Sequence, residues 1–181
     1  INKQYIRYLV FVLIFLISIN ADSKETTNRS MPIAKKGVIN LANWNFINDG
    51  SVILNGEWEF YWNTLLSPSD FPTSLKPLYP QFPQLWNSMT FDSLEIKSTG
   101  YATYRLTLIN CPDDILLALK VPSFYDEYKL WLNGSVFTEN GKVGTSKDES
   151  EPYWLPITKS INSKNDTIEL VLVTNMAPTH P

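Results

Sequence analysis

The residues of this chain best suited to chemistry are aromatic and polar side chains in or beside its turns. A sugar ring stacks its C–H face on tryptophan or tyrosine while nearby polar groups hydrogen-bond its hydroxyls. Seven residues lie in loops, or on strand faces opposite the apolar set, and could work in this way: Trp86, Tyr101, Arg105, Tyr125, Glu127, Trp131 and Tyr153. We therefore predict a small-molecule site, with a carbohydrate as the leading ligand.

Core packing is the alternative explanation for the aromatic residues. Four others alternate with polar neighbours along extended segments and are expected in the core: Trp58, Trp62, Tyr104 and Tyr128. For Trp86 and Trp131 the sequence leaves binding and packing equally open. Asn133, which precedes a glycine, is expected to be a turn residue rather than a ligand contact.

The sequence provides no catalytic constellation. His180 is the single histidine and has no ligand partners near it in the chain, which argues against a histidine base or a zinc site. Glycosidases need two carboxylates facing each other about 5 to 10 Å apart, and the neighbouring pairs Asp113–Asp114 and Asp126–Glu127 do not indicate that arrangement. Residues 141–146 lack the Gly-Lys-Ser/Thr ending of a phosphate loop. We expect no catalysis by this chain, no metal and no cofactor.

Charge and cysteine content exclude further classes. The net charge of -3 and the isoelectric point near 5.2 oppose nucleic-acid binding, which needs a basic patch. Cys111 is the single cysteine, so no disulfide can form within the chain. We expect Cys111 to be a small buried or loop residue beside Pro112.

The first residues have the pattern of a secretory signal. Lys3 and Arg7 precede the apolar run of residues 9–19, and a small-residue cleavage point ends at Ala21. An uncleaved anchor is the alternative, because Ile19 stands where a small residue is preferred. The run is shorter than the roughly 20 residues that a spanning helix needs. We expect a signal segment over 1–21, a linker over 22–36 and one exported domain over 37–181, with more protein beyond Pro181.

Alternation of apolar and polar residues predicts an all-β domain. The expected strands lie at residues 37–41, 52–54, 58–62, 100–109, 115–121, 128–136, 153–157 and 167–174. Asn-Gly pairs at 55–56 and 133–134 predict two hairpin turns. Residues 65–71 offer at most one helical turn before prolines 72, 77, 80 and 83 exclude regular structure, so that excursion could cover a sheet edge or wall a binding site. Short strands separated by turns in this way predict a jelly-roll β-sandwich.

The order of several segments resembles one known domain. These segments are LNGEWEFYW (54–62), PQLW (83–86), GYATYRLTL (100–108), LALKVPSFYDEYKLWLNG (117–134), GKVGTS (141–146) and DTIELVLVTN (166–175). Together they resemble the extracellular jelly-roll domain of bacterial seven-transmembrane receptors with diverse intracellular signalling modules (7TMR-DISM). That fold is similar to the galactose-binding-like, sugar-binding domain of family 2 glycoside hydrolases. The Gly-Lys-Val-Gly-Thr-Ser segment favours the receptor family.

The resemblance implies a ligand-sensing domain on the periplasmic or extracellular side of a bacterial membrane. It also implies seven following membrane helices and an output module such as a nucleotide cyclase, a histidine kinase or a diguanylate cyclase. Two alternatives stay open. The chain could be the sugar-binding domain of a secreted hydrolase, or an interaction module that pairs with a second receptor copy or an envelope protein without a small ligand. The gene beyond Pro181 would separate receptor from hydrolase.

Overall fold

The computed structural model describes residues 29–91, 94–113, 115–122, 127–141, 143, 156–161 and 166–176, with the side chain of Met176 left aside. The predicted signal segment, Tyr125, Tyr153 and most of residues 141–146 lie outside the described residues. From Met31 onward the chain forms one unit by its internal contacts. Within the described part, no helix is long and apolar enough to cross a membrane.

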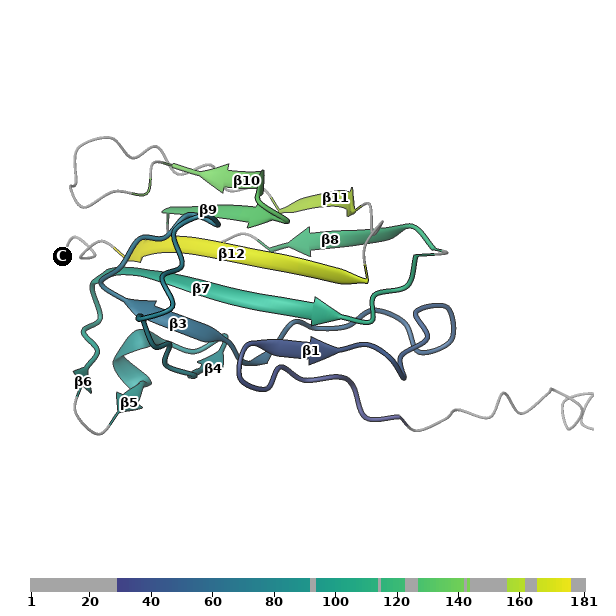
Figure 1. The fold of residues 1–181 in the computed structure, drawn as a ribbon, viewed down its shortest axis with the longest axis horizontal. Coiled ribbons are helices and arrows are strands. Elements are labelled where there is room, and N and C mark those ends of the chain that lie inside the picture. The colour runs from purple at the N-terminus through teal and green to yellow at the C-terminus, as the bar shows by residue number, and fades with distance from the viewer. Residues whose placement is uncertain are drawn as a thin grey trace, which may run out of the picture. The chain divides into compact units, whose positions relative to one another are not determined.

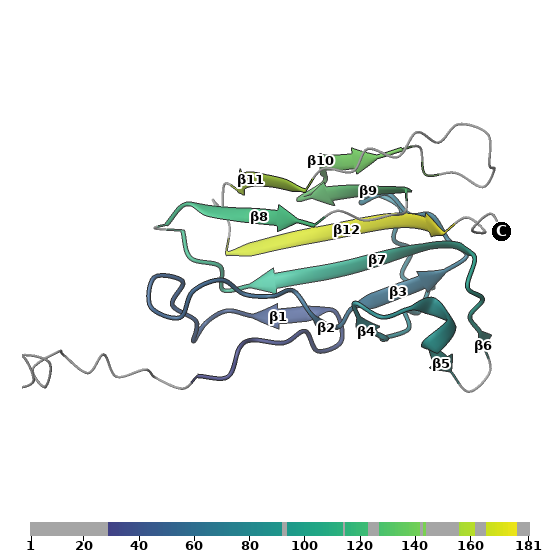
Figure 2. The ribbon, with the colours of Figure 1, turned by 180° about the vertical axis from the view of Figure 1, so that it is seen from behind.

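Six strands form the main sheet of the fold (Figures 1 and 2). They are β1 (Val38–Asn40), β3 (Glu59–Trp62), β7 (Gly100–Ile109), β9 (Glu127–Leu132), β10 (Ser135–Asn140) and β12 (Thr167–Met176). The two long strands β7 and β12 pair along their whole length, and β9 and β10 follow on the far side of β12. On its other side β7 pairs with β3, antiparallel, and with β1, parallel.

Shorter strands make the second layer of the sandwich. They are β2 (Gly56–Glu57) with β4 (Gln81–Phe82), β5 (Thr90–Phe91) with β6 (Leu94–Glu95), and β8 (Leu117–Val121) with β11 (Ile157–Ile161). A single 3₁₀ turn, η1 (Trp86–Ser88), lies between β4 and β5. The chain leaves the main sheet after β7 to form β8 and after β10 to form β11, returning each time. The predicted all-β jelly-roll sandwich is confirmed.

The core lies between these layers because side chains alternate along the strands. Tyr104, Leu106 and Leu108 of β7 face inward, while Arg105 and Thr107 face outward, as the sequence predicts. Phe60 packs on Tyr104 with ring centroids 4.8 Å apart. The expected core residues are confirmed as buried or, for Trp62, as partly buried against the core: Trp58, Trp62, Tyr104 and Tyr128.

The hairpin predicted at Asn133–Gly134 is confirmed. It joins β9 to β10, and both turn residues have positive φ, 47° and 79°, as a type I′ turn requires. Asn133 Oδ1 also accepts a hydrogen bond of 2.8 Å from the Glu169 backbone N–H, which ties the turn to β12. Asn133 is thus a turn residue, as expected.

The hairpin predicted at Asn55–Gly56 is wrong. Residues 52–54 form no strand, and β3 pairs instead with β7, far along the chain. Gly56 pairs with Phe82 of β4 on one side and bridges Ala34 on the other. Val52 and Leu54 pack against the core instead of pairing with β3. Long-range pairing and apolar burial therefore outweigh the local turn signal at this position.

Two segments are more ordered than the sequence predicts. Ala34 lies within the predicted linker, yet it is buried and its N–H donates to the Asn55 carbonyl oxygen at 2.8 Å. The sequence predicts a strand at 153–157, of which residues 153–155 lie outside the described part; β11 begins at Ile157 and extends to Ile161. Its middle residues are exposed, so the strand has little apolar alternation to reveal it.

Candidate functional site

Four of the seven predicted site residues lie on one face of the main sheet. Tyr101 and Arg105 on β7, and Glu127 and Trp131 on β9, point away from the core because they occupy the alternate positions of their strands. β12 lies between these strands, and its Val171 is in register with both Arg105 and Trp131. We call this surface the outer face. Arg105 and Trp131 sit about 10 Å apart on it, two strand spacings.

Arg105 is occupied by ion pairs on the outer face. Its Nε donates to Glu169 Oε1 at 2.8 Å, and its Nη2 lies 2.7 Å from the same oxygen. A second carboxylate, Glu59, lies 3.7 Å from Nη1, and the Phe71 ring covers the guanidinium at 4.6 Å. Burial by itself lowers the pKa of Arg105, but Glu169 and Glu59 outweigh it and raise the pKa. Arg105 therefore joins three strands and a loop.

Glu127 and Tyr101 lie on the outer face near the starts of β9 and β7. Asn175 of β12 is in register with both residues, and its Nδ2 donates to Glu127 Oε2 at 2.8 Å. Thr174 Oγ1 donates to the Glu127 backbone carbonyl oxygen at 2.9 Å. Within the described residues, the other oxygen of the Glu127 carboxylate accepts no such bond, and a carboxylate can accept at both oxygens.

Trp131 lines a cleft of about 530 Å³ on the outer face. The loop of residues 65–70 forms one wall, the β9–β10 hairpin forms the other, and Val173 of β12 contributes to the lining. Across the hairpin, Lys129 Nζ lies 2.9 Å from Glu139 Oε2 and 5.5 Å from the centre of the Trp131 ring. An aromatic surface and fixed charges thus meet in one concave site.

The loop wall is held on the sheet by a buried threonine. Thr103 of β7 is fully buried, and its Oγ1 accepts from the Leu66 N–H at 2.9 Å and donates to the Thr64 carbonyl oxygen at 2.8 Å. Leu66 is itself buried. This loop belongs to the proline-rich excursion that could wall a site, and residues 65–70 do form such a wall.

Asp70 is the acidic residue of the loop wall. Its Oδ2 accepts from the Ser67 N–H at 3.0 Å and from the Ser67 hydroxyl, and its Oδ1 accepts from Ser69 Oγ at 3.2 Å. Its own N–H returns a 2.9 Å bond to the Ser67 carbonyl oxygen. These hydrogen bonds lower the pKa of Asp70 because they favour the charged form.

We expect Asp70 to titrate below about 3.9, the usual value for aspartate. Because the folded pKa is lower than the unfolded one, the carboxylate stabilises the loop above the unfolded pKa, and this stabilisation is lost as the pH falls through the folded pKa. Carboxyl carbon chemical shifts measured against pH give the midpoint. Ser67→Ala removes the hydroxyl that donates to Asp70 and should raise the midpoint of its titration. An unchanged midpoint would contradict this role of the Ser67 hydroxyl.

Trp86 lies in the core, away from the cleft. Trp86 is the first residue of η1 and is 4 % exposed, and its Nε1–H donates to the buried Tyr104 hydroxyl at 2.8 Å. It also packs edge-on against Trp62, with ring centroids 4.9 Å apart. A ligand on the surface cannot stack on this ring. Of the two explanations that the sequence left open for Trp86, the structure places it in core packing.

The cleft contains polar residues that the sequence analysis missed. Asp70, Lys129 and Glu139 line it with Trp131. Lys129 and Glu139 could have been predicted from the sequence, because a hairpin centred on Asn133–Gly134 places them nearly opposite each other. The shift in register after Val136 makes them direct partners. Asp70 could not have been predicted to join them, because only tertiary packing brings its loop to the hairpin. In the described part of the chain, no group of three or more His, Cys, Asp or Glu residues is placed to hold a metal.

Comparison with known proteins gives only distant structural matches. No family model matches the sequence, and no curated protein matches it. Among solved structures, a β-glucuronidase of an uncultured Clostridium sp. superposes with a TM-score of 0.48 at 18% identity, over 67% of this chain and 21% of that one. The β-glucuronidase of Faecalibacterium prausnitzii gives 0.44 at 17% identity over 67% and 20%, and that of Ruminococcus gnavus gives 0.45 at 17% over 67% and 20%. The chain spans about a fifth of the length of these enzymes, and the matches assign no activity to it.

Proposed function

We propose that this domain binds a carbohydrate in the cleft beside Trp131 and performs no chemistry on it. The observation that carries the proposal is the combination of an aromatic ring with fixed charged groups in one concave site. A sugar needs both, because its C–H face is apolar and its edge carries hydroxyls. The apolar pocket on the other side of the main sheet has one aromatic ring, Phe46, and one charged side chain, Lys120, but its described lining holds no carboxylate to accept hydrogen bonds from hydroxyls.

Each cleft residue has a definite task in this binding. The Trp131 ring supplies the stacking surface. The carboxylates of Asp70 and Glu139 accept hydrogen bonds from hydroxyls, and the Lys129 ammonium donates them. These charged groups are already positioned, Asp70 by its serine neighbours and Lys129 by Glu139, so little ordering is left for the ligand to induce.

We further propose that the domain is the sensing part of an exported bacterial receptor. The order of its segments supports this through their resemblance to receptor sensor domains, and the basic and apolar leader pattern supports export. Ligand binding would bias a membrane region between two states by its differential affinity for them. The leading partner is then a small molecule, on the periplasmic or extracellular side of the membrane.

Trp131→Ala should abolish carbohydrate binding and leave the fold intact. A glycan array on the purified chain identifies the sugar, and calorimetric titration then measures its affinity. Loss of the stacking surface should weaken binding at least about tenfold, or about 1.4 kcal/mol. The unfolding midpoint in urea should move little, because Trp131 is half-buried on the outer face rather than in the core.

Two controls make this result specific. Trp131→Phe keeps an aromatic surface and should retain part of the affinity. Val136→Ala changes the exposed cross-strand neighbour of Trp131, which does not line the cleft, and should bind like the parent chain. The proposal fails if no glycan binds the chain, or if Trp131→Ala binds normally. Concentration-dependent dimerisation without any glycan binding would instead favour the interaction-module alternative.

A further inference from the structure

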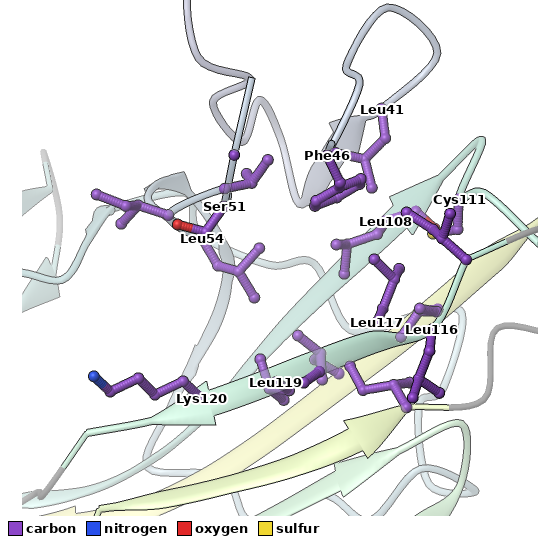
Figure 3. A pocket seen from close by; sticks show the side chains of 18 of the residues that line it. Leu41, Phe46, Ser51, Leu54, Leu108, Cys111, Leu116, Leu117, Leu119 and Lys120 are labelled. Atoms are coloured by element: carbon purple, nitrogen blue, oxygen red, sulfur yellow. The ribbon is translucent and has the colours of Figure 1, made fainter. Parts of the chain in front are cut away.

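A second, apolar pocket of about 740 Å³ opens between the two layers of the sandwich, on the core side of the main sheet (Figure 3). The segment of residues 41–54 forms one wall and β8 forms the other. Figure 3 shows Phe46 and Leu54 reaching from the first wall toward Leu108, Leu117 and Leu119 across an open space. The volume is in the range of pockets that hold small ligands, about 300 to 1,000 Å³.

The chemistry of the lining restricts what this pocket can hold. Among its described lining residues, Ser51 and Lys120 carry the only strongly polar side chains, and Cys111 is a weakly polar one. Burying a hydroxyl without a hydrogen-bond partner costs free energy, so the interior does not suit a sugar or a nucleotide. A hydrocarbon chain meets no such penalty there.

Exposed aliphatic residues surround the same pocket. Ile47, Ile53 and Leu116 line it and are 78%, 60% and 81% exposed. Scattered apolar side chains on a surface are ordinary, but a cluster around one opening marks a binding site. A ligand that filled the pocket would remove part of this apolar surface from water.

The first wall is held in place by its own hydrogen bonds. Asn45 Oδ1 accepts from the Ile47 and Asn48 N–H groups, both at 3.0 Å, and Asp49 Oδ2 accepts from the Asn45 N–H at 2.9 Å. Trp44 Nε1 donates to the Gly50 carbonyl oxygen at 3.0 Å. These hydrogen bonds fix the shape of the turn itself, so a ligand has little ordering to induce within this wall.

We propose that this pocket binds a single aliphatic chain with an anionic head, as in a long-chain fatty acid. The aliphatic lining receives the chain, and Lys120 pairs with the carboxylate. Lys120 lies at one end of the pocket in Figure 3 and is exposed. Because it alternates with Leu117 and Leu119 along β8, its side chain leaves the strand on the solvent side and meets a carboxylate at the rim of the pocket rather than inside it. It has no ion-pair partner among the described residues. The site is separate from the Trp131 cleft, so either proposal can fail without the other.

A chain-length series tests the apolar part of the proposal. Saturated fatty acids of increasing length are titrated calorimetrically into the delipidated full chain, below their micelle-forming concentrations. Each added methylene should tighten binding roughly fourfold until the pocket is full, after which the affinity should level off. Absence of saturable binding, or affinity that does not depend on length, would overturn the proposal.

The anionic head is tested with alcohols of equal length. Each fatty acid should bind roughly two- to fivefold more tightly than its alcohol, the range expected for an exposed ion pair. Lys120→Met should remove this difference by weakening only the acid. If acid and alcohol bind equally well to the parent chain, Lys120 does not recognise the head.

Cys111 reports on the same pocket by an independent route. It is the single cysteine and contributes to the lining, but it is buried and burial raises the pKa of its thiol, so a small thiol reagent such as N-ethylmaleimide should label this one site slowly. Bound fatty acid should slow this labelling in proportion to occupancy. Labelling at an unchanged rate under saturating fatty acid would contradict the site.

A pair of leucine variants locates the binding. Leu116→Asp places a charge at the rim, and because this side chain is 81% exposed the fold should tolerate it. Fatty-acid affinity should fall at least tenfold. Leu85→Asp makes the same change at another exposed leucine, 68% exposed and outside the pocket, and should leave the affinity unchanged. Equal losses in both variants would refute binding in this pocket.

Discussion

Trp86→Ala is expected to lower the free energy of unfolding by about 3–5 kcal/mol, the usual cost of removing a buried tryptophan. The ring is buried at the start of η1, against Trp62, and the Tyr104 hydroxyl loses the hydrogen bond that Trp86 donates. Burial raises the pKa of Tyr104, and the Trp86 hydrogen bond opposes that rise. Urea denaturation followed by circular dichroism measures the free energy.

Two variants separate packing from hydrogen bonding at this position. Trp86→Phe keeps much of the apolar ring but removes the N–H donor, and should cost less than the alanine variant, about 1–3 kcal/mol. Leu85→Ala changes the exposed preceding residue and should cost under about 0.5 kcal/mol. A Trp86→Ala protein of normal stability that lost carbohydrate binding would return Trp86 to the binding site.

Gly56→Ala is expected to cost roughly 2–5 kcal/mol, because strain and collision add at one position. Gly56 has a φ of 111°, which a residue with a Cβ adopts only with strain. An added Cβ would lie 2.5 Å from the Ala34 carbonyl oxygen and 2.7 Å from the Ala34 nitrogen. The Ala34 backbone cannot withdraw freely, since it is hydrogen-bonded to Asn55 and to Glu57. Thermal or urea unfolding measures the loss.

Gly134→Ala is the matched control for this prediction. Gly134 also has a positive φ, 79°, but an added Cβ there would meet no atom within 4 Å. It should therefore cost only the backbone strain, about 1–2 kcal/mol. The difference between the two variants measures how firmly the segment around Ala34 packs against Gly56. Equal losses would mean that this segment does not pack there in solution.

Arg105, Trp131 and Trp86 show which positions of predicted site residues could be inferred from the sequence and which could not. Alternation placed Arg105 on the face opposite the apolar set, where it lies, and left Trp131 open between binding and packing; the structure places Trp131 on the outer face. The same reasoning could not place Trp86, because it begins a single 3₁₀ turn and belongs to no alternating strand. Its burial depends on Tyr104 and Trp62, which are distant in the chain. Nor could it show that Arg105 would be occupied by Glu169 and Glu59.

The two Asn-Gly pairs show the same limit in the fold. At Asn133–Gly134 the flanking residues pair with each other, so a local signal suffices and the hairpin forms as predicted. At Asn55–Gly56 the flanking residues have stronger partners elsewhere, in β7 and β4. The dipeptide is the same in both places, and the outcome depends on which strands pair with the residues that flank it.

By itself the sequence determined the all-β class and the faces of the long strands. These properties follow from alternation over neighbouring residues, which share one backbone geometry. Tertiary structure alone decided which residues share a cleft: Asp70 meets Trp131 because Thr103 anchors the loop, and Phe46 faces Leu117 because the two layers stand apart there. Such contacts join residues far apart in the chain, and their closeness depends on the packing of every element between them.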